Sequence, residues 1–388
     1  MSQAVDFLDV ARQSAGSHAW RETYRAYSEV GEHDLPPDDL ERFAEAAWWT
    51  GKLDEAIRLR ERAYTAYTAS GDKRGAARMA LTLSWDHEGR GAFAVSHGWH
   101  ASAERLLEGQ PEWPEHGRLL LTNALTALFA EGDLEKAEVL FLSAMELGER
   151  VGDRDVQVLA LSGRGRVRIK DGRVEEGLAI LDEATAAAVS GGLQPHATGL
   201  VYCLTISSCR DLGDYRRAAE WTEAANRWCD RLDVTGFPGA CRIHRAEVMR
   251  LRGDWPAAEA QAQAACDELQ DFDRRVTAGG YYEIGEIRRR RGDFAGAEEA
   301  YRTANELGGD PQPGLALLRL AEGKVDAAVA GIERSLQDTQ DPLARIGRLP
   351  ARIEIAIAAG DLRTARTALA ELEQIVDSYK IGDRKSVV

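Results

Sequence analysis

The residues best suited to chemistry stand close together at His87, His97 and His100, with Asp86 and Glu88 beside the first of them. Imidazole and carboxylate groups bind zinc, and the spacing of His97 and His100 places both on one face of a helix. The surrounding stretch has little apolar periodicity, however, and no pattern that would supply supporting hydrogen bonds to such ligands. We therefore expect no metal site here.

Motifs for catalysis and for nucleotide binding are absent from the sequence. It contains no G-x-x-x-x-G-K-[ST] phosphate loop and no G-x-G-x-x-G after a strand pattern. It also contains no G-x-S-x-G elbow and no H-E-x-x-H pair. The sequence therefore predicts neither an enzyme nor a cofactor site.

Charge and hydropathy argue against nucleic acids and membranes as partners. The 388 residues carry a net charge of -15, which argues against general affinity for DNA or RNA. The basic run 288–291 suits the negative end of a helix dipole, and a contact with phosphate or an acidic peptide is the alternative. No stretch approaches the roughly 18 apolar residues of a membrane helix, and the first residues lack an export signal. We expect a cytoplasmic protein without membrane contacts.

The elements that must position any binding residue repeat along the chain. Glycines followed by one residue and then an apolar residue recur at intervals of about 40 residues, with one shorter interval of 31. Small side chains stand 5 residues after each glycine and, almost always, 12 residues after it. These two positions are two helical turns apart, so both face the same neighbour. The turn glycines are Gly51, Gly91, Gly132, Gly172, Gly213, Gly253, Gly292, Gly323 and Gly360.

The stretch 281–307 shows the repeating unit most clearly, as two short helices around a glycine turn. Small residues at the helix contacts let the two backbones approach closely. Its pattern resembles the tetratricopeptide repeat (TPR). The residues that carry this resemblance are Tyr281, Ile284, Gly285, Gly292, Asp293, Phe294, Ala297, Tyr301 and Ala304.

A hairpin of this kind cannot bury its apolar stripe alone, so the units must stack. We predict an all-α fold, a TPR-like α-solenoid of about nine to ten helical hairpins in a right-handed superhelix. We expect 19 or 20 helices, no sheet, and a single domain over residues 1–382. Pro350 falls inside an expected helix and should kink it or delay its start. The short interval before Gly323 leaves a short first helix over 314–322.

Nearly the whole chain also resembles the TPR sensor region of bacterial LuxR-type transcriptional regulators. In that family the helical array binds a signal or a partner, and a C-terminal helix-turn-helix reads DNA. This sequence has no nucleotide-binding domain before the repeats and no room for a helix-turn-helix after Leu372, so we expect no direct binding of nucleic acid. A free-standing TPR scaffold for protein–protein interaction is the alternative. The segments that carry the resemblance are Glu45-Ala46-Ala47-Trp48-Trp49-Thr50-Gly51-Lys52-Leu53-Asp54, Gly236-Phe237-Pro238-Gly239 with Cys241-Arg242-Ile243-His244-Arg245-Ala246-Glu247, and Asp310-Pro311-Gln312-Pro313-Gly314-Leu315-Ala316-Leu317.

The last six residues, 383–388, read like the in-frame translation of a widely used sequencing adapter. They also lack the polar terminal helix with which a solenoid covers its last apolar face. We expect a non-native tail, and a natural gene that continues beyond about Gly382.

A binding surface follows from the geometry of TPR-like stacks, in which the first helices line the concave face. Their exposed stripe is expected 10, 6 and 3 residues before each turn glycine. Such a groove suits a protein or peptide, or a small polar ligand, and side chains with no task beyond solvation are the alternative. The candidate binding residues are Trp85, Thr122, Thr126, Ser162, Arg166, Ser207, Arg210, Glu247, Arg250, Tyr282, Glu286 and Arg289, with Phe129 on the same stripe.

Overall fold

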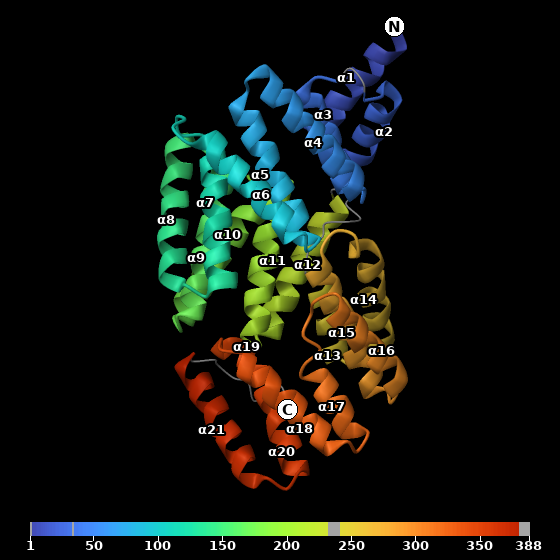
Figure 1. The fold of residues 1–388 in the computed structure, drawn as a ribbon, viewed down its shortest axis with the longest axis vertical. Helices are drawn as coiled ribbons and strands as arrows, with labels where there is room; N and C mark the ends of the chain where they lie inside the picture. The colour runs from blue at the N-terminus through green and yellow to red at the C-terminus, as the bar shows by residue number, and fades with distance from the viewer. Residues whose placement is uncertain (1, 33–34, 232–240, 380–388) are drawn as a thin grey trace.

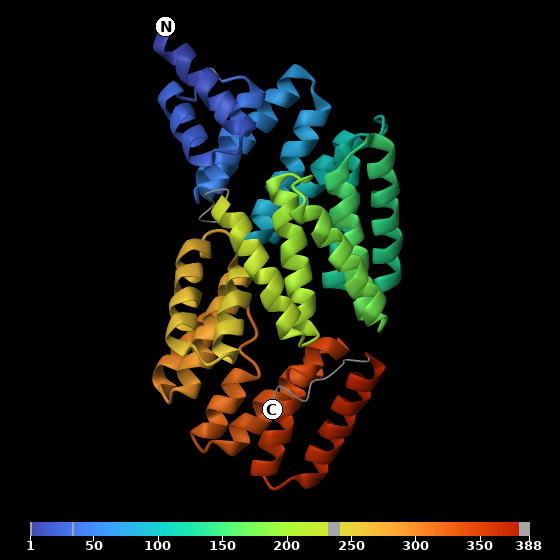
Figure 2. The ribbon, with the colours of Figure 1, turned by 180° about the vertical axis from the view of Figure 1, so that it is seen from behind.

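The computed structural model describes residues 2–32, 35–231 and 241–379, and all regular elements in these ranges are helical. The helices form ten antiparallel hairpins that stack into a superhelix (Figures 1 and 2). The predicted all-α solenoid is therefore confirmed. The segment 236–239 and the terminal residues 383–388, both singled out in the sequence, lie outside the described residues.

The hairpins follow one another without interruption along the chain. They are α1 (Ser2–Gly16) with α2 (Trp20–Val30), α3 (Pro37–Trp49) with α4 (Leu53–Ser70), α5 (Lys73–Gly89) with α6 (Phe93–Leu107), α7 (Pro114–Thr126) with α8 (Leu134–Val151), α9 (Arg154–Lys170) with α10 (Val174–Val189), α11 (Pro195–Asp211) with α12 (Tyr215–Arg231), α13 (Cys241–Leu251) with α14 (Trp255–Leu269), α15 (Arg274–Arg290) with α16 (Phe294–Glu306), α17 (Gly314–Ala321) with α18 (Val325–Asp338), and α20 (Leu349–Ala358) with α21 (Leu362–Ser378). The short helix α19 (Pro342–Ile346) precedes α20, and a π-helix, η1 (Ala127–Glu131), continues α7.

The turns explain why glycine and aspartate recur together. All nine turn glycines have positive φ, between 68° and 86°, a conformation that glycine adopts without steric cost. An aspartate directly after the glycine then caps the second helix. Asp133, Asp293 and Asp361 each accept a hydrogen bond from the backbone N–H three residues further on. The Gly-Asp pair thus ends one helix and starts the next.

The small residues of the repeat allow aromatic rings to pack between the two helices of a hairpin. The side chain of Tyr301, on α16, is fully buried against Gly285 of α15. A Cβ atom at Gly285 would lie 2.6 Å from the Tyr301 ring, closer than atoms can approach. Between consecutive hairpins, Gly163 of α9 makes the same kind of room for the ring of Phe141 from α8. These glycines therefore set the spacing of the hairpins.

Two irregular stretches follow from proline and from repeat length. Pro350 is the second residue of α20, and α19 and α20 stand where a single first helix was expected. This split brings the described residues to 21 α-helices instead of the predicted 19 or 20. The helix α17, Gly314–Ala321, has only 8 residues, as the shortened interval before Gly323 indicated.

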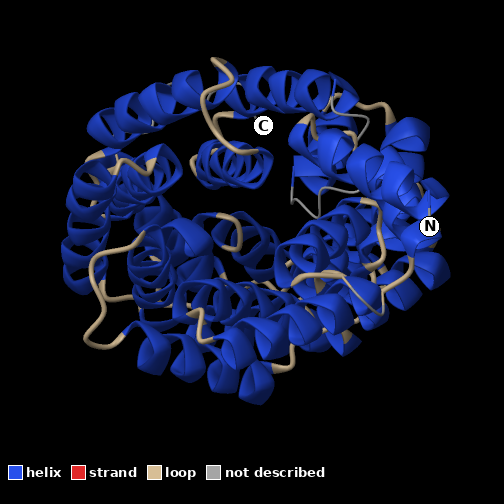
Figure 3. Ribbon diagram, turned by 90° about the horizontal axis from the view of Figure 1, so that it is seen from above, coloured by secondary structure: helices blue, strands red, loops and turns tan. Residues whose placement is uncertain are grey.

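The hairpins form two layers. The first helices contact one another in the series α5, α7, α9, α11, α13, α15 and α17, while each second helix packs against the first helices on either side of it. The first helices therefore form the inner layer. Viewed from above, the helices are arranged in a ring (Figure 3).

Both ends of the superhelix pack against its middle. The Trp48 ring on α3 lies 5.5 Å from the His196 ring at the start of α11 and 5.9 Å from the Phe272 ring before α15. At the other end, Leu343 and Tyr379 share an apolar cluster with residues of α9 and α10. Hairpins that are far apart in the chain are therefore in contact at two places. Within the described residues no helix is both long enough and apolar enough to cross a bilayer.

Candidate ligand-binding site on the inner helices

The predicted binding residues lie on α5, α7, α9, α11, α13 and α15, all helices of the inner layer. Four of them are buried, although an exposed stripe was expected. Ser162, Arg166, Arg250 and Glu286 are 0%, 8%, 8% and 5% exposed. The expectation of an exposed position was wrong for these four residues because the first helices pack directly on one another, which places this part of the stripe at helix–helix contacts.

Arg166 on α9 connects to α11 through Ser208 and Asp211. Its Nη1 donates to Ser208 Oγ at 2.8 Å, and its Nη2 pairs with Asp211 Oδ2. Arg210 also uses Asp211, donating from Nη2 to Oδ1 at 2.9 Å. Burial alone would raise the pKa of Asp211, but Arg166 and Arg210 outweigh it and lower the pKa to about 2. One carboxylate thus serves two guanidinium groups.

The π-helix η1 presents Phe129 to the same cluster. The Phe129 ring lies 5.2 Å from the guanidinium carbon of Arg166, within reach of a cation–π interaction, and the side chain is 47% exposed. A π-helical turn inserts an extra residue and changes the direction of the side chains that follow, and such turns are frequent at functional sites. Phe129 is therefore an exposed aromatic side chain next to a buried cation.

Arg250 on α13 and Glu283 on α15 form a buried ion pair. Arg250 Nε donates to Glu283 Oε2 at 2.6 Å, and each side chain is 7% exposed. Burial raises the pKa of Glu283 to about 7; Arg250 opposes this rise, and repulsion from Glu247 adds to it. Glu247 lies 3.8 Å from His244 on the same helix. This part of the inner layer is crowded with carboxylates.

Glu286 is held as a buried anion by three donors. Tyr301 Oη donates to its Oε1 at 2.6 Å, Arg289 Nε donates at 3.3 Å, and Arg290 also pairs with it. Burial would raise the pKa of Glu286, but Arg289 and Arg290 lower it to about 2. The Tyr282 ring, half-buried, lies 5.8 Å from the Tyr301 ring. This cluster joins α15 to α16.

Five predicted residues lie on the inner layer without joining these clusters, the buried Ser162 among them. The hydroxyl groups of Thr122, Thr126 and Ser207 each donate to the backbone carbonyl four residues earlier in their own helix. Trp85, 38% exposed, has its ring 6.1 Å from that of His196. Trp85 therefore belongs to the contact between the first hairpins and α11.

Sequence reasoning missed the partners of the predicted arginines and glutamates, namely Asp211, His244, Glu283 and Tyr301. His244 and Glu283 stand 9 residues before their turn glycines, and Asp211 stands 2 residues before Gly213. These positions adjoin the predicted stripe on the same helix. A signal was present, since a buried arginine needs a carboxylate. Asp211 could have been found by looking one hairpin beyond Arg166.

Several buried polar atoms of this region make no hydrogen bond among the described residues. They are Ser162 Oγ, Arg166 Nε and both ring nitrogens of His244, from α9 and α13. Burial and the nearby Arg210 lower the pKa of His244, which favours the neutral ring. An unpaired buried polar group costs about 1–3 kcal/mol. Buried polar atoms where α9, α11 and α13 pack together are therefore available for further hydrogen bonds.

A recess of about 760 Å³ lies elsewhere, between the first three helices and Gln194. It is lined in part by Arg12, Asp39 and Arg42. Both arginines pair with the buried Asp39, at 2.6 Å and 3.1 Å. The charges of this recess therefore hold the N-terminal hairpins together, and the inner layer remains the stronger candidate site.

The histidine cluster of the sequence is not assembled into a metal site. Among the described residues no group of three His, Cys, Asp or Glu side chains is placed to hold an ion. His100 Nε2 instead lies 3.5 Å from Glu104 Oε1, four residues along α6.

Comparison with known proteins supports the fold at low sequence identity. No protein-family model and no curated protein matches this chain. Among solved structures, a Rap protein complexed with Competence and Sporulation Factor is similar over 98% of this chain and 99% of its own, with 13% identity and a TM-score of 0.55. The apo form of RapI has 10% identity over 98% of this chain and 99% of its own, with a TM-score of 0.48.

A tetratricopeptide repeat protein from Parabacteroides merdae ATCC 43184 is also similar, with 17% identity and a TM-score of 0.42 over 68% of this chain and 98% of its own. At such identities a likeness concerns the fold alone. The Rap protein, with a TM-score of 0.55, is thus the neighbour that supports the helical-repeat fold of this chain.

Proposed function

We propose that this chain is a non-catalytic receptor that binds a peptide, or an extended segment of a partner protein, across the inner helices α7 to α15. One observation carries the proposal. Charged and aromatic side chains come together where successive first helices contact one another. Some of these side chains remain exposed to solvent. Arg210 is 40% exposed and Phe129 is 47% exposed, although both adjoin the partly buried Arg166–Asp211 ion pair.

An extended peptide fits this arrangement better than a compact ligand does. Its backbone N–H and C=O groups need polar partners at intervals along the chain, and each hairpin adds one row of such partners. Exposed or half-buried polar side chains on α7, α11 and α13 supply them; they include Thr126, Ser207 and Glu247. That a Rap protein of similar fold is complexed with Competence and Sporulation Factor supports a binding role for a stack of this shape.

The wider context that we favour is the sensing region of a LuxR-type transcriptional regulator in a bacterial cytoplasm. The sequence resemblance in 45–54 and 310–317 is its support. A free-standing scaffold for protein–protein interaction is the second candidate. The genomic locus separates the two, because a reading frame that continues into a basic helix-turn-helix supports the regulator and a frame that stops near Gly382 supports the scaffold.

Selection of peptides tests the receptor itself. A phage-displayed library of random peptides is panned against the whole chain, and affinities of the selected peptides are measured by fluorescence anisotropy. We expect Phe129→Asp to weaken binding about 10-fold, since it places a charge in the apolar part of the inner surface. The matched control is Val139→Asp, because Val139 is 58% exposed and lies on the outer helix α8.

Circular dichroism and thermal unfolding first establish that each variant is folded. Selected peptides that lose affinity for the Phe129 variant and keep it for the Val139 variant support inner-face binding. A selection that yields no peptide, or peptides that bind both variants equally well, contradicts the proposed function.

A further inference from the structure

A small recess of about 40 Å³ lies where the N-terminal hairpins meet the turn before α15. Its walls combine three aromatic rings with two carboxyl groups. A single buried water molecule needs roughly 10–15 Å³, so the recess has room for about three groups of that size. The residues that supply these walls are Trp48 of α3, Trp85 and Asp86 of α5, and Phe272 and Asp273 of the turn before α15.

The aromatic rings of the recess stand at steep angles to one another. The centroids of the Trp48 and Phe272 rings are 5.9 Å apart, and their planes differ by 79°. Both side chains are buried, whereas Trp85 is 38% exposed, so the recess borders solvent beside the Trp85 ring. The face of an aromatic ring carries partial negative charge and attracts a cation within about 6 Å. Adjoining aromatic walls of this kind hold organic ammonium groups in proteins.

Asp86 brings to the recess a hydrogen-bond acceptor that has no donor. The side chain is 3% exposed, and its Oδ2 pairs with Arg60 Nη1. Its Oδ1 makes no hydrogen bond among the described residues. Burial raises the pKa of Asp86, although Arg60 and a hydrogen bond from Trp48 oppose the rise. Arg60 therefore compensates the buried carboxylate only in part.

Asp273 adds a second carboxyl group from the other side of the contact. Its Oδ1 accepts hydrogen bonds from the backbone N–H groups of Arg275 and Val276, at 2.9 Å and 3.0 Å, and so caps α15. Burial raises the pKa of Asp273 as well, although these bonds and the charge of Arg275 oppose the rise. Both carboxyl groups of the recess are thus short of positive charge.

The side chains around the recess supply no further cation to it. Among its described lining residues there is no Lys, Arg or His. The His196 ring lies 5.5 Å and 6.1 Å from the two tryptophan rings, but burial and nearby arginines lower its pKa to about 4, so it is neutral near pH 7. Arg274, next to Asp273, donates instead to the backbone oxygen of Glu306 at 3.2 Å.

We infer that this recess binds a primary alkylammonium group. The N–H donors of such a group provide the partner that Asp86 Oδ1 lacks, and its charge offsets the two carboxylates. Its methylene groups contact the aromatic rings and leave the recess beside Trp85. The group is carried by a free aliphatic amine or by a lysine side chain.

A metal ion fits the recess less well than an ammonium group does. Hard cations such as Ca²⁺ take six to eight oxygen ligands, and the recess offers two carboxyl groups among aromatic walls. A bound ammonium group also contacts both sides of the place where α3 and α5 meet the turn before α15. Its binding therefore strengthens the contact between hairpins that are far apart in the chain.

Titration of the whole chain with n-butylammonium chloride tests the inference, with the heat of binding measured by calorimetry at fixed ionic strength. We expect saturable binding. The uncharged n-butanol should bind at least about 10-fold more weakly, because it has no charge to offset the carboxylates. Tetramethylammonium should also bind about 10-fold more weakly, because it has no N–H group for Asp86.

Two substitutions locate the bound group. Asp273→Asn removes a charge but keeps an oxygen that caps α15, and it should weaken n-butylammonium binding about 10-fold and leave n-butanol unaffected. Asp133→Asn is the matched control, since Asp133 caps α8 in the same way. Trp85→Ala should also weaken binding about 10-fold. Its control is Phe93→Ala, because Phe93 is 58% exposed and lies outside the recess.

The source of the ammonium group follows from a second titration with the Nα-acetyl amide of lysine. Affinity equal to that of n-butylammonium, or tighter, indicates a lysine side chain, and weaker affinity indicates a free amine. Phe129→Asp, which should weaken binding of selected peptides, should leave n-butylammonium binding unchanged. The recess and the proposed peptide receptor can therefore fail separately.

Four results would overturn the inference. The first is the absence of saturable binding by the unaltered chain. The second is equal affinity for n-butylammonium and n-butanol, which indicates an apolar hole only. The third is tighter binding of tetramethylammonium, which contradicts a hydrogen bond to Asp86. The fourth is a loss of affinity that is equal in the recess variants and in their controls, with every variant folded by circular dichroism.

Discussion

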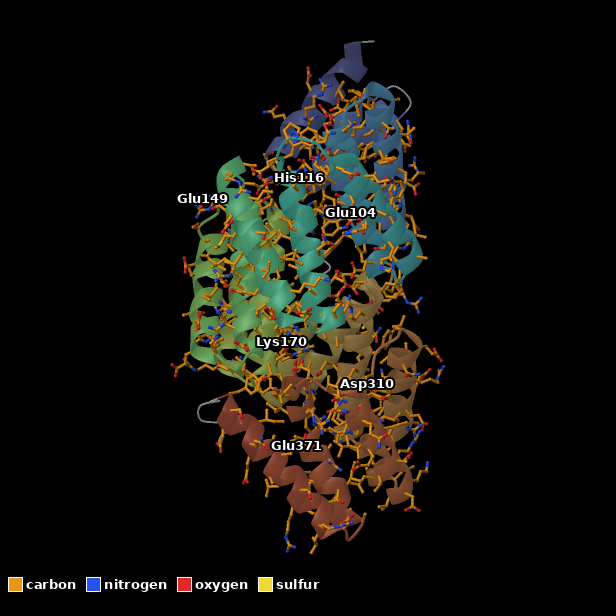
Figure 4. All side chains as sticks on the ribbon, turned by 60° about the vertical axis from the view of Figure 1, so that its left-hand side comes forward. Glu104, His116, Glu149, Lys170, Asp310 and Glu371 are labelled. Carbon is orange, nitrogen blue, oxygen red and sulfur yellow. The ribbon has the colours of Figure 1, made fainter. Side chains whose placement is uncertain are left out.

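Lys170 Nζ lies 2.5 Å from Asp341 Oδ2 and joins two residues that are 171 positions apart in the chain. Tyr379 Oη donates to the backbone oxygen of the same Lys170 at 3.0 Å. Figure 4 shows Lys170 where the lower end of α9 meets the C-terminal helices. Arg166 stands one helical turn earlier on α9. The contact that closes the superhelix and the buried Arg166 therefore share one helix.

Tyr379→Ala should release the C-terminal helices from α9 and α10. The substitution removes an aromatic ring that is 7% exposed, together with its hydrogen bond to Lys170, at an expected cost of about 3 kcal/mol. Hydrogen exchange measured by mass spectrometry should show faster exchange in 349–378 and unchanged exchange in α3 and α4. Lys136→Ala is the control, because its ion pair with Glu131 is exposed and local. Uniform acceleration along the chain would show that the C-terminal contact is not a separate unit.

Two glycine-to-alanine substitutions should change the free energy of unfolding in opposite directions. At Gly89 a Cβ atom would lie 2.7 Å from the backbone oxygen of Phe272, so the contact between α5 and the start of α15 must open, at about 1–3 kcal/mol. Gly98, inside α6, has open space at the same position, and Ala there should stabilise the helix by up to about 1 kcal/mol. Urea unfolding measures both. Equal effects would mean that the Gly89 contact does not hold the N-terminal hairpins.

The hairpins could be predicted because the information that forms them is local. Gly292 and Ala297 lie within one turn and the start of one helix, and a turn glycine followed five residues later by a small side chain recurs nine times in the sequence. The contact of Trp48 with His196 and Phe272 could not be predicted in this way, since no period links these positions. The curvature of the superhelix decides which distant hairpins meet, and curvature accumulates from small rotations between neighbours.

The candidate site could be predicted only in part for the same reason. The offsets from the turn glycines placed Arg166 and Arg250 on the inner helices. Their burial depends on how closely neighbouring first helices approach, and their partners Asp211 and Glu283 lie one hairpin further along the chain. A pattern within one repeat does not identify a pair between two repeats until the sequences of neighbouring repeats are compared.

The pH dependence of stability should show the raised pKa of Glu283. Burial raises the pKa of this carboxyl to about 7 in the folded protein, whereas the unfolded chain releases the proton near the ordinary glutamate value of 4.5. The folded state therefore binds more protons between these values, and stability falls as pH rises through this range. Glu283→Gln should flatten this slope, on the order of 1 kcal/mol for each unit of pKa displacement. Urea unfolding at a series of pH values measures it.

Glu112 provides a control for the Glu283 prediction, and Asp211 and Glu286 should give a pH dependence of opposite sign. Glu112, an exposed residue whose pKa is lowered by its hydrogen bond to Arg150, does not titrate in this window, so Glu112→Gln should leave the slope unchanged. Asp211 and Glu286 have pKa values lowered to about 2, and the stability that they contribute is lost as pH falls towards that value. An unchanged slope in Glu283→Gln would show that another group titrates there.

The hydrogen bond from Tyr301 to Glu286 should be worth more than a similar one near the surface. Tyr301 is fully buried and donates to a carboxylate that is 5% exposed, whereas Tyr24 donates at 2.7 Å to Glu55, whose side chain is 26% exposed. Removing the donor leaves a buried charge short of a partner only in the first case. We expect Tyr301→Phe to cost about 2 kcal/mol in urea unfolding and Tyr24→Phe less than about 1 kcal/mol. Equal costs would mean that Arg289 and Arg290 satisfy Glu286 without the tyrosine, and the inner layer would then tolerate changes at α16.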